Sequence, residues 1–338
     1  MGDILHALPA ITALRAAHPE WFLGWAVEPQ WHDLLCAGEC DKRGPRMPIR
    51  GLRMPITDAI HIVPAKQWAH APASMKTLRD IRRVRRELRE ARYDVCVDLQ
   101  GAVRSAVIGS WARTSRLIGE DKPREYAARW LFSERVKTRG VHVIEQAIEV
   151  ANAVASELLP AMLPRLPADT NAKIEAHSIA QPFVLISPGA GWGAKRWPTE
   201  RYAAVARGLH QAGYKVIVNT GPGEESITRE LASLSGDSAT VLRLTISELI
   251  AITRRASLAI AGDTGPLHLA SALGKPVVGI FGPTDPARNG PFWGSFKVLR
   301  HPESRRDHAR HAEPEAGLLT ITPEAVLDAA MELLKETK

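Results

Sequence analysis

One pattern recurs along the chain: a short apolar run ends in a polar, glycine-containing turn and leads into a helical segment. The predicted strands at 93–99, 183–187, 215–219 and 258–261 are each followed by such a turn and a helix. Nearly continuous apolar strands are typical of a parallel sheet that is covered on both faces. The alternation predicts an α/β fold whose ligands lie beyond the carboxyl ends of the strands.

Two sets of these strand–helix units are separated by a proline-rich stretch that has no strong periodicity. A length of 338 residues is too great for one typical compact domain and sufficient for two. We therefore expect two Rossmann-like domains facing a cleft. The expected boundaries are 1–160 for the first domain, 161–181 for a linker, 182–321 for the second domain and 322–338 for a C-terminal helix.

Charge and hydropathy restrict the setting in which the chain works. No apolar run reaches the roughly 18–20 residues of a membrane span, and no signal peptide opens the sequence. We expect a cytoplasmic protein that is at most peripheral to a membrane. The net charge of +7 fits a nucleic acid, a phosphorylated substrate or an acidic membrane. The predicted helix at 74–92 carries seven arginines on one face, which indicates either a solvated surface or contact with anionic lipid or acceptor.

The turn after strand 258–261 is the most informative candidate site. A helix predicted to begin at Pro266 directs the backbone N–H groups of Thr264 and Gly265, and the positive end of its dipole, toward a ligand. His268 lies one turn further and can donate to a phosphate. This pattern predicts an anion site that needs no metal. The alternative is that Asp263 caps the helix and His268 is solvated.

Two other turns have groups suited to a diphosphate or nucleoside. Gly191 lies in a glycine-rich loop whose backbone can approach a ligand closely, and Lys195 follows with a positive charge. The helix after this loop starts too late for a dinucleotide fingerprint, which argues against NAD. In the second turn, Glu224 and Glu225 either complement a helix dipole or accept hydrogen bonds from nucleoside hydroxyls.

Asp3 is the candidate base of the first half. Its carboxylate is expected on a turn before a helix at 7–17, where it could serve as a general base or simply cap the helix.

Four segments and their order resemble glycosyltransferase family 9, the bacterial heptosyltransferases, over essentially the whole chain. The segments are MGDILHALPAITALR, VDLQGAVRSA, SPGAGWGAKRWP and GDTGPLHLASALGKPVVGIFGPTDP. WAVEP and DLQG are more similar to heptosyltransferase I than to II. The resemblance implies a B-type glycosyltransferase fold, inversion at the anomeric carbon, and no metal or other cofactor. The implied donor is ADP-L-glycero-β-D-manno-heptose. The implied acceptor is Kdo of Kdo₂-lipid A on the cytoplasmic face of the inner membrane, and no nucleic acid is involved.

The resemblance also assigns roles to single residues. Asp3 would be the general base that deprotonates the acceptor, and Lys195 would neutralise the leaving diphosphate. The other implied donor contacts are Glu224 (or Glu225) at the nucleoside, Leu244 at the adenine, Asp263 at the heptose hydroxyls, Thr264, Gly265 and His268 at the phosphates, and the backbone at Gly191.

The start of the sequence departs from the family pattern. Members of this family begin with an apolar strand just before the Met-Gly-Asp turn, so we expect that strand to be missing here, and the chain to be less stable and less active than one that has it.

Three alternative functions remain open. They are another heptosyltransferase (II or III) or related nucleotide-sugar transferase, a sugar-nucleotide epimerase, and a catalytically impaired nucleotide-sugar-binding protein.

Overall fold

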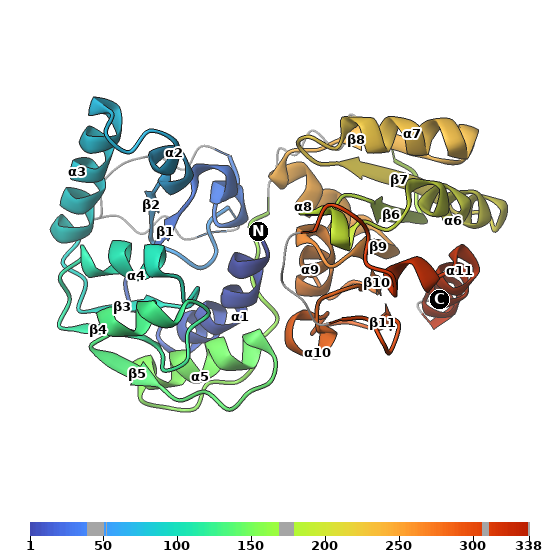
Figure 1. The fold of residues 1–338 in the computed structure, drawn as a ribbon. Helices are drawn as coiled ribbons and strands as arrows, with labels where there is room; N and C mark the ends of the chain where they lie inside the picture. The colour runs from blue at the N-terminus through green and yellow to red at the C-terminus, as the bar shows by residue number, and fades with distance from the viewer. Residues whose placement is uncertain (39–50, 52, 169–178, 306–310, 337–338) are drawn as a thin grey trace. The chain divides into compact units, whose positions relative to one another are not determined.

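The computed structural model describes residues 1–38, 51, 53–168, 179–305 and 311–336. The chain divides into two compact units between residues 169 and 170, and each unit combines helices with parallel strands (Figure 1). This confirms the predicted α/β fold class. Part of the predicted linker at 161–181 lies outside the described residues.

Over residues 179–305 and 311–336, the second unit forms one parallel sheet of six strands in the order β11-β10-β9-β6-β7-β8. Numbered from the start of the unit this order is 6-5-4-1-2-3, the Rossmann arrangement, with β6 at the centre. The strands are β6 (Phe183–Ser187), β7 (Lys215–Thr220), β8 (Thr240–Arg243), β9 (Leu258–Gly262), β10 (Val277–Ile280) and β11 (Phe296–Leu299). The α-helices are α6 (Thr199–Gln211), α7 (Glu225–Ser235), α8 (Ile246–Arg255), α9 (Gly265–Ala272), α10 (Pro286–Asn289) and α11 (Pro323–Glu336).

The core of this unit lies against the central strands. Every residue of β6 and β9 is buried. Trp197 and Tyr202 pack edge to face with ring centroids 4.7 Å apart, and both belong to the largest apolar cluster. α11 adds Val326 and Ala330 to the same cluster. The loops that leave these strands are therefore held on a rigid base.

In the described residues of the first unit there are two separate parallel sheets, one of two strands and one of three, in the orders β1-β2 and β3-β4-β5 (Figure 1). The strands are β1 (Gly24–Val27), β2 (Ala59–Ile62), β3 (Val95–Asp98), β4 (Arg116–Glu120) and β5 (Glu134–Val136). The α-helices are α1 (Gly2–Ala17), α2 (Ala65–His70), α3 (Met75–Glu90), α4 (Val103–Ser110) and α5 (Val143–Ala155).

Helix α1 begins five residues earlier than its sequence pattern predicts. The backbone N–H groups of Ile4 and Leu5 each donate to the carbonyl of Met1 at 3.1 Å, which closes the first turn there. Asp3 therefore lies in the first helical turn, and the prediction of a turn before the helix is wrong. A carboxylate in this position is favourable for the helix dipole.

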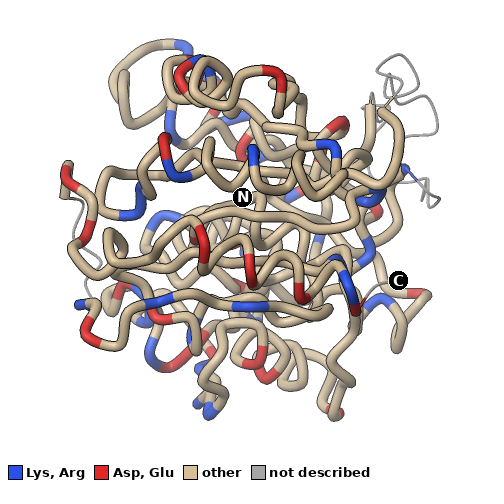
Figure 2. The backbone as a smooth tube through the Cα atoms, turned by 90° about the vertical axis from the view of Figure 1, so that its right-hand side faces the viewer, with Lys and Arg blue, Asp and Glu red and all other residues tan. Residues whose placement is uncertain are grey.

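Helix α3 is the arginine-rich helix. Ser74 caps it, because its hydroxyl accepts from the backbone N–H of Thr77 at 3.1 Å. Val84 and Leu88 are buried, whereas Leu78 on the first turn is 39% exposed. No helix within the described part of the chain is long and apolar enough to cross a membrane. Figure 2 shows basic and acidic residues interspersed on the side turned to the viewer, so the net positive charge is not gathered there into one stripe.

Candidate active site

The predicted donor residues gather at one edge of one sheet. Because all six strands of the second unit are parallel, the loops that follow β6, β7, β8 and β9 leave at the same edge. These loops and the turns that follow them contain Gly191, Lys195, Glu224, Leu244, Asp263, Thr264, Gly265 and His268. Ligands of open α/β sheets bind at this edge.

A buried ionic cluster lies at the centre of this edge. The Lys195 ammonium forms an ion pair with Oδ2 of Asp263 and lies 3.4 Å from the Asp263 carbonyl oxygen. Nε2 of His268 lies 3.1 Å from Oδ1 of the same carboxylate. Asp263 is 6% and His268 8% exposed. Thr264, not Asp263, is the N-cap residue of α9, so the capping alternative for Asp263 is wrong.

Burial alone would raise the pKa of the Asp263 carboxyl. The hydrogen bond from His268 and the nearby charges of His268 and Lys195 outweigh burial, and the pKa falls well below its usual range. Lys195 is further held by the ring of Trp192, whose centroid lies 4.3 Å from Nζ. The cluster thus fixes one anionic and one cationic group at the start of α9.

This pKa predicts the acid sensitivity of the fold. A carboxyl with a lower pKa in the folded than in the unfolded state stabilises the fold above its unfolded pKa of about 3.9, and that stabilisation is lost as the pH falls below it. We expect Asp263→Asn to flatten the decline of unfolding free energy between about pH 5 and pH 2. Guanidinium titrations across this range measure the slope, and Asp328→Asn on the exposed face of α11 is the control. Equal slopes for the parent and Asp263→Asn would contradict the prediction.

The first turn of α9 is open to an anion. Among the described residues, no side chain caps the amide groups of this turn, and the Thr264 hydroxyl donates instead to the carbonyl of Gly262 at 3.2 Å. Pro266 has no N–H of its own and suits the first turn. The amide of Gly265 and the helix dipole together favour negative charge at this end of the helix.

The structure separates the two candidate glutamates. The Glu224 carboxylate accepts from the backbone N–H of Gly221 at 2.9 Å, and a Cβ added at Gly189 would lie 1.8 Å from its Oε1. Glu224 therefore faces the glycine loop after β6, while Glu225 pairs with Arg243 at 3.7 Å. Burial raises the pKa of Glu224, against the opposing hydrogen bond from Gly221 and the charge of Arg196. The family resemblance named Glu224 as the nucleoside contact and left Glu225 as a possibility, and it is Glu224 whose carboxylate faces the glycine loop.

The glycine loop depends on a residue that the sequence pattern did not single out. A Cβ added at Gly191 meets nothing within 4 Å, whereas one at Gly193 would lie 1.5 Å from the carbonyl oxygen of Ala312. Backbone atoms cannot move aside as a flexible side chain does. We expect Gly193→Ala to lower the unfolding free energy by about 1–3 kcal/mol, and Gly191→Ala to leave it unchanged. Chemical denaturation of both variants tests this, and equal effects at the two positions would contradict it.

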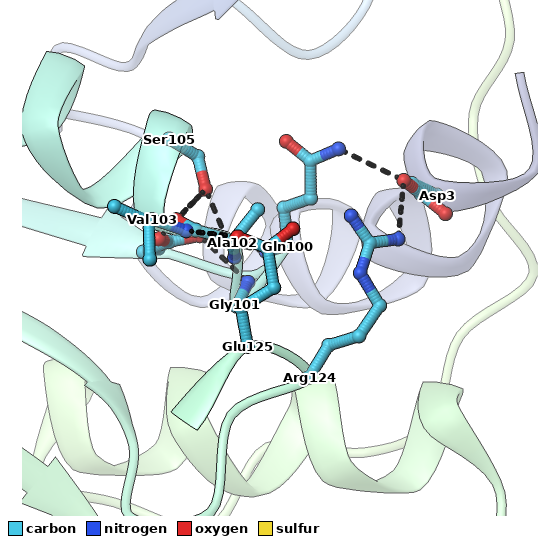
Figure 3. Close-up of polar contacts among 9 residues, drawn as sticks. Asp3, Gln100, Gly101, Ala102, Val103, Ser105, Arg124 and Glu125 are labelled. Atoms are coloured by element: carbon cyan, nitrogen blue, oxygen red, sulfur yellow. Dashed lines mark hydrogen bonds and ion pairs between the residues drawn. The ribbon is translucent and has the colours of Figure 1, made fainter. Parts of the chain in front are cut away.

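The candidate base of the first unit is held by two neighbours. Gln100 Nε2 donates to Oδ2 of Asp3 at 2.9 Å, and Arg124 Nη1 approaches the same oxygen at 3.3 Å (Figure 3). The Asp3 side chain is 53% exposed. One carboxylate oxygen is thus positioned by an amide and a guanidinium, while the group stays accessible to a substrate hydroxyl.

Buried contacts hold the loops that position Asp3. The Asp98 carboxylate at the end of β3 accepts from the backbone N–H groups of Gln100 and Gly101 at 2.8 and 3.0 Å, and from the Ser105 hydroxyl at 2.9 Å. Gly101 has a φ of +66°, and a Cβ there would lie 2.9 Å from the backbone nitrogen of Arg124. The tight turn after β3 therefore fixes both partners of Asp3. Sequence reasoning missed Gln100 and Arg124, since only the fold brings residues 3, 100 and 124 together.

The described side chains were also compared with the requirements of a metal site. Within the described ranges, no group of three or more His, Cys, Asp and Glu side chains could hold a metal ion.

Comparison with known protein families assigns the chain to one family. The model of glycosyltransferase family 9 (heptosyltransferase) matches residues 81–318. The chain belongs to glycosyltransferase family 9. It is therefore a glycosyltransferase, as the sequence motifs predict. The matched range includes the whole carboxyl edge of the six-stranded sheet and the turn after β3.

Curated relatives are similar over most of the chain. Lipopolysaccharide heptosyltransferase 1 of Escherichia coli strain K12 is 26% identical over 98% of this chain and 97% of its own length. The protein of the same name from Pseudomonas aeruginosa is 26% identical over 86% and 79%. Lipooligosaccharide heptosyltransferase 2 of Haemophilus influenzae is 25% identical over 75% and 79%.

Solved structures support the fold. An Escherichia coli heptosyltransferase determined with ADP aligns with a TM-score of 0.76 at 21% identity, over 100% of this chain and 97% of that one. A family 9 glycosyltransferase from Veillonella parvula aligns with a TM-score of 0.78 at 19% identity, over 99% and 95%. The two-unit Rossmann-like fold is therefore that of the family.

Proposed function

We propose that the enzyme transfers heptose from ADP-L-glycero-β-D-manno-heptose to Kdo of Kdo₂-lipid A, with inversion and without a metal. The proposal depends on the Lys195–Asp263–His268 cluster at the open first turn of α9, which suits a diphosphate and a sugar hydroxyl side by side. Relatives named lipopolysaccharide heptosyltransferase 1 that match almost the full chain favour this donor and acceptor.

The proposed roles combine what the family resemblance implies with the contacts described above. The acceptor hydroxyl oxygen forms a bond to the anomeric carbon while the bond from that carbon to the diphosphate oxygen breaks. Asp3 takes the hydroxyl proton, and ADP leaves with the bonding electron pair. Lys195, His268 and the amides of α9 stabilise the charge that develops on the diphosphate, because they are already oriented and need not reorganise.

The remaining groups at this edge are assigned to recognition of the donor. Glu224 accepts hydrogen bonds from nucleoside hydroxyls, since its carboxylate faces the glycine loop. Leu244 is half-buried just after β8, where it would border the adenine. Asp263 holds heptose hydroxyls with the oxygens that Lys195 and His268 orient.

The acceptor and its membrane are assigned to the first unit. Arg79, Arg82, Arg85 and Arg86 of α3 are exposed, and Met75 on the same helix is 70% exposed. Exposed cations beside an exposed apolar side chain suit the headgroup region of an anionic membrane. We propose peripheral contact here, on the cytoplasmic face of the inner membrane. Sedimentation with phosphatidylglycerol vesicles tests it, with reduced binding expected for Arg82→Gln combined with Arg85→Gln.

The decisive experiment is transfer from ADP-heptose to Kdo₂-lipid A in the presence of EDTA. We expect product with the chelator present, and none from Asp3→Ala under the same conditions. A folded protein that binds ADP but gives no product with this acceptor would overturn the proposed reaction.

A second candidate is transfer of heptose to an acceptor that already carries heptose. It is favoured by the 25% identity to lipooligosaccharide heptosyltransferase 2 over 75% of the chain. Parallel assays with Kdo₂-lipid A and heptosyl-Kdo₂-lipid A distinguish the two, because each reaction requires a different terminal sugar.

A further inference from the structure

The turn that holds Lys195 is paired with residues near the end of the chain. Ala194, which directly precedes Lys195, is 2% exposed. Its backbone N–H donates to the carbonyl of His311 at 3.1 Å, and its carbonyl accepts from the backbone N–H of Glu315 at 3.2 Å. Both backbone groups of Ala194 are therefore satisfied by a segment that is distant in sequence, and the position of the turn depends on where that segment lies.

This segment, residues 311–318, lies directly against two loops at the carboxyl edge of the sheet. A Cβ added at Gly193 would lie 1.5 Å from the carbonyl oxygen of Ala312. A Cβ added at Gly282, in the loop after β10, would lie 3.3 Å from the carbonyl oxygen of Ala194. Backbone approaches backbone closely at both points, so the turn can move only if the segment or the loop moves with it.

The Glu315 carboxylate fixes the conformation of the 311–318 segment. Its Oε2 accepts from the Ser304 hydroxyl at 3.0 Å and from the backbone N–H of Leu318 at 2.9 Å, and its Oε1 accepts from the backbone N–H of Arg305 at 3.4 Å. Burial alone would raise the pKa of Glu315, but these hydrogen bonds and one from Gly317 hold the pKa below its usual range. An ionised carboxylate can accept from all of these donors, whereas a neutral amide has only one accepting oxygen.

A second arm of contacts leads from Glu315 to the loop after β10. Ser304, which donates to Glu315, is 6% exposed, and its carbonyl accepts from Arg300 Nη2 at 2.6 Å. Nε of Arg300 donates to the carbonyl of Gly282 at 3.1 Å. Glu315 is therefore connected with the turn at Ala194 through its backbone and with the neighbouring loop through its side chain.

We propose that Glu315 is a positioning residue for the diphosphate of the donor. Its carboxylate fixes the 311–318 segment, this segment fixes Ala194, and the turn then holds the Lys195 ammonium where the leaving phosphate develops charge. The inference rests on the proposed function, in which Lys195 neutralises the departing ADP. A displacement of about 1 Å is enough to weaken such a group greatly, so a residue that touches no substrate can still control it.

The test measures binding of ADP and AMP to the full chain and to Glu315→Gln by titration calorimetry. We expect the Kd for ADP to rise about tenfold, because a displaced cation loses part of a charge-assisted contact. The Kd for AMP should change by less than about twofold, since AMP lacks the second phosphate to which Lys195 is assigned. Glu313→Gln, an exposed carboxylate in the same segment, is the matched control and should bind both nucleotides like the parent. Ser304→Ala, which removes one donor to Glu315, should raise the Kd for ADP by a smaller factor.

A background without the cation distinguishes positioning from a general loss of structure. Lys195→Met combined with Asp263→Asn removes both buried charges, and adding Glu315→Gln to it should change the Kd for ADP by less than about twofold. Amide exchange at Ala194 should become at least about fivefold faster in Glu315→Gln, while exchange in β7 and β9 stays at the parent rate. The inference is overturned if ADP and AMP lose affinity equally, or if the loss for ADP is the same without Lys195.

Failure of this inference is distinguishable from failure of the proposed function. A parent chain that binds no ADP counts against the proposed donor. A parent chain that binds ADP, with an affinity that Glu315→Gln leaves unchanged, rejects the positioning role of Glu315 alone.

Discussion

Replacing Asp3 with asparagine is expected to lower kcat for heptose transfer by about 10²–10⁴-fold. Asparagine keeps the size of the side chain, and its oxygen can still accept from Gln100 and Arg124. It cannot take a proton from the acceptor hydroxyl. The side chain is 53% exposed, so the unfolding free energy should change by less than about 0.5 kcal/mol.

Steady-state assays over a range of both substrates separate this effect from weakened binding. Asp328→Asn, an exposed carboxylate on α11, is the matched control and should retain the parent kcat. If Asp3→Asn retained the parent kcat while its KM for the acceptor rose, Asp3 would be a binding residue and not the base.

Replacing Lys195 with methionine is expected to have two large effects. The loss of a preoriented cation at the leaving group should lower kcat by about 10²–10³-fold. Asp263, which is 6% exposed, would then keep a buried charge, with His268 as the remaining side-chain partner among the described residues. Removing one member of a buried ion pair costs about 3–5 kcal/mol, so the unfolding free energy should fall by a similar amount.

The double variant Lys195→Met with Asp263→Asn distinguishes the two effects. Removing both charges should restore most of the lost stability, because no uncompensated ion remains buried, but it should not restore turnover. Lys215→Met at the exposed start of β7 controls for the loss of a lysine. Additive losses of stability in the double variant would show that the two residues do not act as a pair.

Local patterns in the sequence were sufficient for the central strands and for the class of fold. The runs at 183–186 and 258–261 are apolar throughout, and every residue in them is buried, as expected of strands that are covered on both faces. The edge strand β11 has no buried residue, and β8 is only half-buried or exposed along its length. The sequence analysis does not predict these strands, because only some of their side chains, such as Val241 and Leu299, pack against the core and no continuous apolar run marks them.

Local patterns along the chain define the turns that place polar and glycine residues after apolar strands, and the order of these turns indicates the family. Three features are visible only in the folded chain: Glu224 and not Glu225 faces the glycine loop, Gly193 and not Gly191 has no room for a side chain, and Gln100 and Arg124 contact Asp3. Turns and strands depend on residues that are neighbours in sequence, so their patterns can be recognised along the chain. Contacts such as that of Arg124 with Asp3 join residues 121 positions apart, and strand order is fixed by packing of whole helices on a sheet. Long-range contacts and strand order therefore depend on the complete fold, and no local sequence pattern predicts them.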